Sequence, residues 1–151
     1  MILYILRHGD PDYANDCLTP KGKLQALALA KRLAVHGLDK IYTSPLGRAI
    51  QTAKPTCDLL GLDYAIEPWT SENIAWKSFA TILPNGKEHW VFGQQNTLIK
   101  NDDTVHLGAR WYEAGELKYV DCKRGYDILS AESDKFLMKL GYKRKGSIYE
   151  V

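Results

Sequence analysis

The segment Arg7-His8-Gly9 carries three residue types that suit the handling of a phosphate group. A guanidinium offers a planar fork of donors, an imidazole nitrogen can accept a phosphoryl group, and glycine lets a ligand approach the backbone closely. The segment follows the apolar run Met1–Leu6, whose lack of polar alternation predicts a buried central strand. Because open parallel sheets bind ligands at the carboxyl ends of their strands, we expect Arg7 and His8 at such an edge.

A second cationic residue, Arg48, lies within the segment 42–53, which reads Tyr-Thr-Ser-Pro-Leu-Gly-Arg-Ala-Ile-Gln-Thr-Ala. Residues 40–43 predict a short strand, and the pair Ser44-Pro45 is typical of a helix start. A helix amino terminus attracts anions through its unpaired amides and its dipole, and Arg48 adds a full positive charge. We therefore expect Arg7, Arg48 and this helix end to converge on one dianionic group.

The elements that must position these side chains alternate between strand and helix. Thr19 and Pro20 predict the start of a helix that reaches about Val35, and a second helix is expected over 44–60, with Gly61 ending it. Another short strand is expected at 63–67. Two successive crossovers imply an α/β fold with a mostly parallel central sheet and helices on both faces.

The regular alternation ends after residue 68, and 69–123 are predicted to form an insertion or lid. A chain of 151 residues has the ordinary size of one domain, so we expect a single domain with its core at 1–68 and 124–151. The elements expected in this half are short helices at 71–80 and 105–114, a longer helix at 125–140 and a last strand at 147–151. The aromatic residues of the insertion either line a mouth over the phosphate site or form a small core of their own; they are Trp69, Trp76, Trp90, Trp111 and Tyr112.

Composition narrows the classes of partner. A net charge of +2, with basic residues spread along the chain, gives no single-sign field for nucleic acid or a membrane surface. The apolar opening is far shorter than the roughly 18 residues of a membrane span and leads to no cleavage site, so a cytoplasmic location is expected. The three cysteines are widely spaced and predict reduced structural thiols. His36, His89 and His106 show no metal-ligand spacing, and we expect neither metal nor cofactor.

Three motifs in ordered spacing carry a resemblance to a known family. They are Leu-Arg-His-Gly at 6–9, Leu-Thr-x-x-Gly-x-x-Gln-Ala at 18–26 and Tyr-x-Ser-Pro-Leu-x-Arg-Ala-x-Gln-Thr-Ala at 42–53. Together they are similar to the phosphoglycerate mutase-like histidine phosphatase superfamily, and the similarity covers residues 1 to about 72. The resemblance implies that His8 attacks phosphorus, that Arg7 and Arg48 clamp the phosphoryl oxygens, and that an acidic residue protonates the leaving oxygen.

The resemblance implies an enzyme acting on a small phosphorylated metabolite, either a phosphomonoesterase or a phosphoglycerate mutase-like phosphoryl transferase. The loop after Arg-His-Gly is shorter than in the mutases, which favours the phosphatase. Substrate contacts are expected from Gly9, Asn15 and Ser44, and also from Asp10, which like Asn15 follows the Arg-His-Gly loop. The alternative function is a noncatalytic module that binds phosphorylated ligands.

The identity of the acid has two interpretations. The spacing Trp69-x-x-Glu72 resembles one variant of the family's acidic motif and favours Glu72, which would lie on the helix that leaves the sheet edge. Glu67 follows the same predicted strand and is the alternative.

The sequence departs from the family pattern at its other end. Family members carry a strand with a second catalytic histidine, commonly followed by glycine, after the region that here reads Gly141 to Val151, and no His-Gly pair occurs beyond Arg48. The chain is therefore expected to be a fragment with weak activity, without the carboxy-terminal core strand. A degenerate family member, or replacement by His89 or His106, are the other interpretations. An unpaired central strand would favour self-association into a homo-oligomer.

Overall fold

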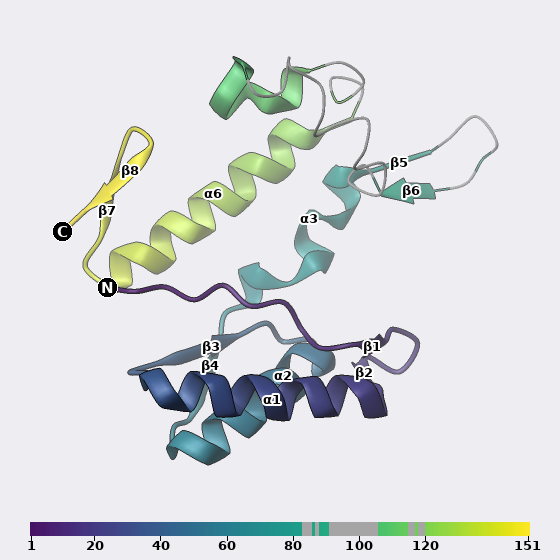
Figure 1. Ribbon diagram of the computed structural model, residues 1–151. Helices are drawn as coiled ribbons and strands as arrows, with labels where there is room; N and C mark the ends of the chain where they lie inside the picture. Colours follow the sequence, from purple (N-terminus) through teal and green to yellow (C-terminus); the bar gives the residue numbers. More distant parts are fainter. Residues whose placement is uncertain (83–85, 87, 91–105, 115–116, 118–119) are drawn as a thin grey trace. The chain divides into compact units, whose positions relative to one another are not determined.

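The computed structural model describes residues 1–82, 86, 88–90, 106–114, 117 and 120–151 (Figure 1). The chain divides into two compact units, Met1–Ser71 and Glu72–Val151. The molecule has an α/β fold in which helices accompany small sheets. The single domain expected at 1–151, with a core of 1–68 and 124–151 and an insertion at 69–123, stays a prediction.

Two helices dominate the first unit and confirm most of the expected helix ends. In α1 (Pro20–His36) the Thr19 hydroxyl accepts a hydrogen bond from the Gly22 amide at 3.1 Å, and Pro20 supplies the preset φ of the first position. Gly61 ends α2 (Gly47–Leu60) in the left-handed conformation at φ 65°. This helix begins after the Ser44-Pro45 pair that was expected to start it, and Leu46 provides no side-chain cap.

Strands β3 (Ile41–Thr43) and β4 (Tyr64–Ile66) pair in parallel, with Thr43 opposite Ile66. This pair and the intervening α2 confirm the second predicted crossover. A short antiparallel hairpin, β1 (Pro11–Asp12) and β2 (Cys17–Leu18), lies between the Arg-His-Gly segment and α1. The single turn η1 (Pro68–Thr70) follows β4.

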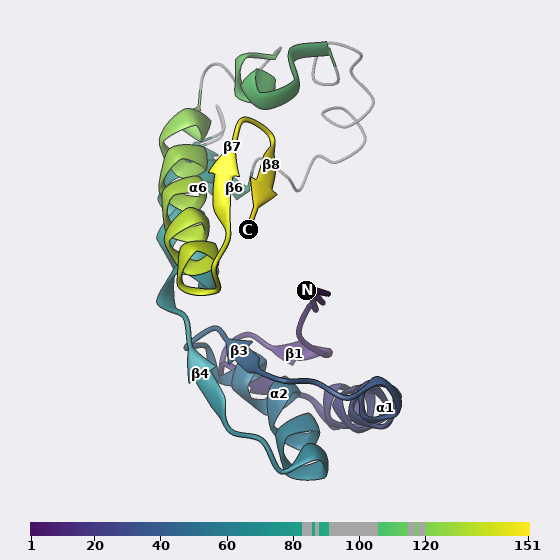
Figure 2. The same cartoon turned by 90° about the vertical axis from the view of Figure 1, so that its left-hand side faces the viewer.

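Helices α1 and α2 lie side by side (Figure 2). The buried residues of α1 are Gly22, Ala26, Ala30 and Leu33. Leu24 and Leu27 are 69% and 51% exposed and lie away from this buried face. Gly22 lies against the main chain of Asp10, and the buried Ala26 and Ala30 have small side chains that permit close packing on this face of α1.

Residues 1–6 do not form the buried central strand that their composition predicts. They run without strand structure (Figure 1), and their side chains are 44–88% exposed. A strand is stabilised by hydrogen bonds to a neighbour, and within the described residues every sheet is two-stranded and none includes this segment. The sequence predicts a large parallel sheet. In the described part of the chain, β3 and β4 are the only strands that pair in parallel.

The second unit contains a long helix, short hairpins and helical turns. Its elements are α3 (Glu72–Phe79), β5 (Ala80–Ile82), β6 (Glu88–Trp90), η3 (Gly108–Glu113), α6 (Cys122–Lys139), β7 (Lys143–Lys145) and β8 (Ile148–Glu150). The helices expected at 71–80 and 125–140 and the strand expected at 147–151 are confirmed. Of the helix expected at 105–114, residues 106–107 are helical and Gly108–Glu113 form the 3-10 segment η3, while residue 105 lies outside the described residues.

An aromatic cluster forms the core of this unit. Its buried centre is Phe79, Ala114, Leu117 and Cys122, against which Trp90, Trp111 and Tyr112 pack among others. Trp76 stacks on Trp90 with ring centroids 4.6 Å apart. For Trp90, Trp111 and Tyr112 the structure thus supports the interpretation that aromatic residues form a core of their own.

The carboxy-terminal hairpin β7–β8 lies beside α6 (Figure 2). The Arg144 Nε atom donates to both Asp134 carboxylate oxygens, at 2.8 and 2.9 Å, and the Tyr149 hydroxyl also donates to Asp134. These bonds join each strand of the hairpin to the helix. No helix within the described residues is long and apolar enough to cross a membrane.

Replacement of Gly125 by alanine should loosen the contact between α3 and α6. An added Cβ would lie 2.6 Å from Cζ of Phe79 and 2.9 Å from Cβ of Ser78. Gly→Ala normally stabilises a helix. Here overpacking should lower the free energy of unfolding by about 1–3 kcal/mol, which outweighs that gain. Urea unfolding of Gly125→Ala measures this loss. Arg124→Ala, at the exposed neighbouring position, is the control, and equal unfolding midpoints for the two variants would contradict the prediction.

Candidate active site

The backbone of the Arg-His-Gly segment is held against α2 and α1. The Gly9 amide donates to the Thr52 hydroxyl at 3.0 Å, and this hydroxyl donates to the Arg48 carbonyl at 2.8 Å. On the other side, a Cβ on Gly9 would lie 2.8 Å from the Gly22 carbonyl oxygen. Both helices therefore fix the segment through its main chain, which leaves its side chains available for other contacts.

The next residue, Asp10, ties the same segment to the first turn of α1. Its amide donates to Oε1 of Gln25 at 2.7 Å, and its carboxylate accepts from the Thr19 hydroxyl at 2.7 Å. A Cβ on Gly22 would lie 2.2 Å from the Asp10 carbonyl oxygen, so only glycine fits there. Motif residues that carry no chemistry thus serve to position the loop.

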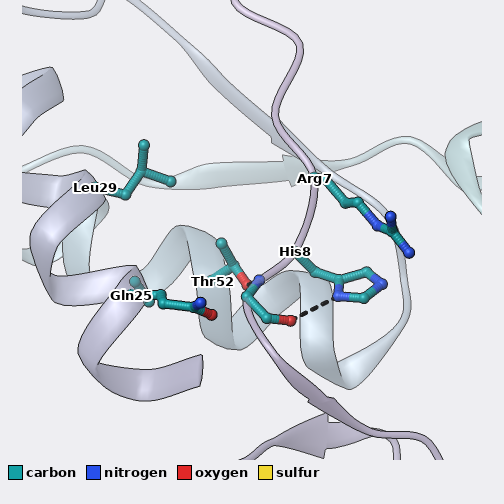
Figure 3. Close-up of a pocket in the computed structure, with 7 residues that line it drawn as sticks. Arg7, His8, Gln25, Leu29 and Thr52 are labelled. Carbon is teal, nitrogen blue, oxygen red and sulfur yellow. Dashed lines mark hydrogen bonds between the residues drawn. The ribbon is translucent and has the colours of Figure 1, made fainter. Parts of the chain in front are cut away.

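The hydrogen bond of His8 defines which ring nitrogen is available for chemistry. Its Nδ1 atom lies 2.7 Å from the Gly9 carbonyl oxygen (Figure 3). A carbonyl only accepts, so Nδ1 carries the proton and Nε2 of the neutral ring carries the lone pair. Nε2 is buried and has no hydrogen-bond partner among the described residues.

A pocket of about 240 Å³ surrounds this segment. In Figure 3 the side chains of Arg7 and His8 extend to one side of the chain, and those of Gln25 and Leu29 lie on the other. The lining residues are Arg7, His8, Gly9, Gln25, Ala26, Leu29 and Thr52.

Arg48 is a buried cation whose charge is paired within the first unit. Its side chain is 8% exposed, and Nη1 donates to Oδ1 of Asp16 at 2.7 Å. The other carboxylate oxygen of Asp16 accepts from the Gly47 amide at 2.6 Å. Asp16 therefore provides from a distant loop the cap that α2 lacks locally. The Gly47 hydrogen bond, followed by the Arg48 contact, lowers the pKa of Asp16 below its ordinary value.

The aromatic ring of Tyr13 contacts both His8 and Arg48. The Arg48 guanidinium carbon lies 5.1 Å from the Tyr13 ring centre, and the His8 and Tyr13 rings form a T-shaped pair with centroids 6.1 Å apart. The structure thus brings the expected nucleophile and one expected clamp to the same ring.

Two further residues expected at the site make local hydrogen bonds. The Asn15 side-chain amide donates to Oδ2 of Asp12 at 2.8 Å, within the loop that carries Tyr13. The Ser44 hydroxyl accepts from the Leu46 amide at 3.3 Å, just before α2. The substrate contacts expected of Gly9, Asn15 and Ser44 stay predictions.

The two candidate acids belong to different units. Glu67 follows β4 in the first unit, where its amide donates to the Thr43 carbonyl at 2.9 Å. Glu72 is the first residue of α3 in the second unit. His106 is exposed, and it belongs to the second unit together with β6, which contains His89. Among the described residues, no group of three His, Cys, Asp or Glu side chains gathers as a metal site.

Sequence reasoning assigned no role to three residues that organise the site: Tyr13, Asp16 and Thr52. Thr52 lies inside the motif at 42–53, and one turn separates it from Arg48, which was a usable signal. Asp16 has a φ of 44°, a conformation that Asp and Asn tolerate better than most residues. Its contact with α2 spans 31 residues, and no local pattern reveals such a contact.

Comparison with known proteins assigns the family. The model of the histidine phosphatase superfamily (branch 1) matches residues 3–77, and this segment belongs to that superfamily. "Probable phosphoglycerate mutase GpmB" of Enterobacter sp. (strain 638) is 30% identical over 100 residues, which are 58% of this chain and 46% of the relative. "Putative phosphoserine phosphatase 2" of Hydrogenobacter thermophilus is 32% identical over 97 residues, 58% of this chain and 45% of that protein.

The chain spans about half the length of these curated relatives. A solved mycobacterial glucosyl-3-phosphoglycerate phosphatase, in complex with inorganic phosphate, is 23% identical with a TM-score of 0.39. The match covers 73% of this chain and 65% of that structure.

The contribution of Asp16 to stability should depend on pH. Because its pKa is lowered on folding, its stabilising contribution is present above the ordinary value of 3.8 and is lost as pH falls through the lower folded pKa. The wild type should therefore be more stable than Asp16→Asn near neutral pH, and the difference should shrink below pH 3.8. Urea unfolding at a series of pH values measures this difference, with exposed Asp63→Asn as the control. A stability difference between the wild type and Asp16→Asn that is independent of pH would show that the charge of Asp16 does not contribute to stability.

Proposed function

We propose that this chain transfers phosphoryl groups from small phosphomonoesters through a phosphohistidine at His8. One observation carries the proposal: the Gly9 carbonyl accepts a hydrogen bond from Nδ1 of His8, which places the lone pair of the neutral ring on Nε2, and His8 lines a pocket together with Arg7. The membership of residues 3–77 in the histidine phosphatase superfamily supports the same chemistry.

In the proposed first step, Nε2 of His8 attacks phosphorus and a phosphorus–nitrogen bond forms. The bond between phosphorus and the ester oxygen breaks, and the departing alkoxide takes a proton from an acidic side chain. In a phosphatase, water then attacks the phosphohistidine while the carboxylate left by the first step takes a proton from it. The phosphorus–nitrogen bond breaks, inorganic phosphate leaves, and both neutral His8 and the protonated acid are restored. In a mutase, a hydroxyl group of the substrate accepts the phosphoryl group instead.

Arg7 and Arg48 are proposed to stabilise the charge on the transferring group. Arg7 lines the pocket with His8, and Arg48 contacts the Tyr13 ring that also contacts His8. Preorganised cations in a partly dry site avoid reorganisation during the reaction, and losing one donor of this kind costs about 3–4 kcal/mol of barrier. The Asp16 contact supports this role because it holds Arg48 in one orientation before substrate arrives.

Glu72 is proposed as the acid, with Glu67 as the alternative. Both residues follow β4. Variants of each residue can be compared on esters with good and with poor leaving groups, which shows which carboxyl group supplies the proton. A small phosphorylated metabolite in the cytoplasm is the proposed partner, and a phosphatase is favoured over a mutase because the loop between Gly9 and Leu18 is short. The names of the two relatives include both reaction types.

Replacement of His8 by alanine should abolish the phosphoenzyme and preserve part of the phosphate affinity, because the arginines provide most of the attraction. Incubation with a radiolabelled aryl phosphate, followed by measurement of acid-labile label, detects the phosphohistidine. His36→Ala, an exposed substitution at the end of α1, should keep the label. Label that persists in His8→Ala would remove this residue from its role. Phosphate binding without label in the wild type would favour the noncatalytic module.

Replacement of Glu72 by glutamine should slow the hydrolysis of alkyl phosphates far more than that of aryl phosphates. Only a poor leaving group requires a proton as the ester bond breaks, and general acid catalysis typically contributes about 10²–10⁴-fold. The ratio of kcat/KM for the two ester classes measures this selectivity. Glu67→Gln is the matched comparison, because a selective loss in that variant alone would move the acid to Glu67. Equal losses on both esters would give Glu72 a structural role.

A further inference from the structure

Tyr13 is a large aromatic residue that lies outside the buried cores, and it is 59% exposed. Its ring nevertheless makes two directed contacts, one with the Arg48 guanidinium at 5.1 Å and one T-shaped contact with the His8 ring at 6.1 Å between centroids. The burial of apolar surface explains little of this placement, because most of the side chain remains in water. Its two partners are the proposed nucleophile and one proposed phosphate clamp.

The loop that carries Tyr13 is anchored on both sides of the ring. Before it, the Asp12 carboxylate accepts from the amides of Ala14 and Asn15, at 3.1 and 3.3 Å, which closes a local turn. After it, Asp16 is bound to the Gly47 amide and to Arg48. The hydrogen bond from the Asn15 side-chain amide, followed by those from the Asn15 and Ala14 main-chain amides, lowers the pKa of Asp12. The Gly47 hydrogen bond and the Arg48 contact lower the pKa of Asp16.

The second anchor also requires a close approach between main chains. A Cβ on Gly47 would lie 2.3 Å from the Asp16 carbonyl oxygen, so the loop can reach α2 only because this residue has no side chain. Between the two carboxylates the chain has little freedom, and the Tyr13 ring is directed toward Arg48.

A cation–π contact suits a phosphate clamp for a physical reason. The ring attracts the delocalised guanidinium charge and carries no net negative charge of its own. A second carboxylate beside Asp16 would instead repel an incoming phosphate. Asp16 restrains one end of the guanidinium by a hydrogen bond, and the ring restrains its rotation.

We propose that Tyr13 is a positioning residue that holds the Arg48 guanidinium toward His8 for contact with a tetrahedral phosphoryl group. The inference rests on the proposed function, because it assigns a role to Tyr13 in the same site. The ring performs this role, and the hydroxyl is dispensable for it.

The test measures the binding of inorganic phosphate to the full chain by isothermal titration. Tyr13→Leu should raise the dissociation constant about two- to fivefold, the range expected when an exposed cation–π contact is lost. Tyr13→Phe retains the ring and should keep most of the affinity. Tyr64→Leu is the matched control, since this tyrosine is 37% exposed on β4 and outside the site. In an Arg48→Gln background, the effect of Tyr13→Leu should disappear, because its action passes through the cationic side chain at position 48.

A second measurement separates this inference from the proposed function. The Arg48 Cδ protons should show a ring-current shift in NMR spectra that Tyr13→Leu removes and Tyr13→Phe preserves. If the shift is present but the wild type binds no phosphate, the proposed function fails and the positioning contact stands. An unchanged shift in Tyr13→Leu overturns the inference, as does equal phosphate binding by Tyr13→Leu and Tyr64→Leu, or equal loss in Tyr13→Phe and Tyr13→Leu.

Discussion

The organisation of the first unit depends on the charge of one buried guanidinium. Arg48 is 7% exposed at the beginning of α2, and transfer of an unpaired cation into such a place is strongly unfavourable. Asp16 supplies the counter-charge and at the same time caps the helix through Gly47. Because Asp16 belongs to the loop after Arg-His-Gly, the need to neutralise Arg48 also draws that loop onto α2. A helix start, a loop conformation and the placement of an aromatic ring thus share one electrostatic cause.

Local signals in the sequence predict much of this unit, because the interactions that they encode are themselves local. Thr19-Pro20 and Gly61 set helix ends through a capping hydroxyl, a fixed φ and a left-handed residue. The start of α2 shows the limit of such signals. Ser44-Pro45 has the expected composition, yet the helix begins at Gly47 and takes its cap from Asp16, far away in the sequence.

The exposed opening segment illustrates a different limit. Six consecutive apolar residues predict a strand covered on both faces, and this inference assumes neighbouring strands that provide hydrogen bonds and cover. In the described residues, β3 and β4 pair only with each other, and the segment remains without strand structure. For the candidate site, the sequence motifs predict the chemical groups, and these predictions for Arg7, His8 and Arg48 stay proposals. The supporting contacts of Thr52 and Tyr13 emerge only once the helices pack together.

The three thiols differ in burial, and this difference has a practical consequence. Cys122 is fully buried and its pKa is raised to about 11, and burial also raises the pKa of Cys57. Alkylating reagents attack the thiolate of accessible cysteines, so both are poorly reactive in the folded protein. Cys17 is partly exposed. It is the first residue of β2 and directly follows Asp16. A thiol-directed spectroscopic label applied to the native protein is therefore directed to Cys17, where it reports on the loop that neutralises Arg48.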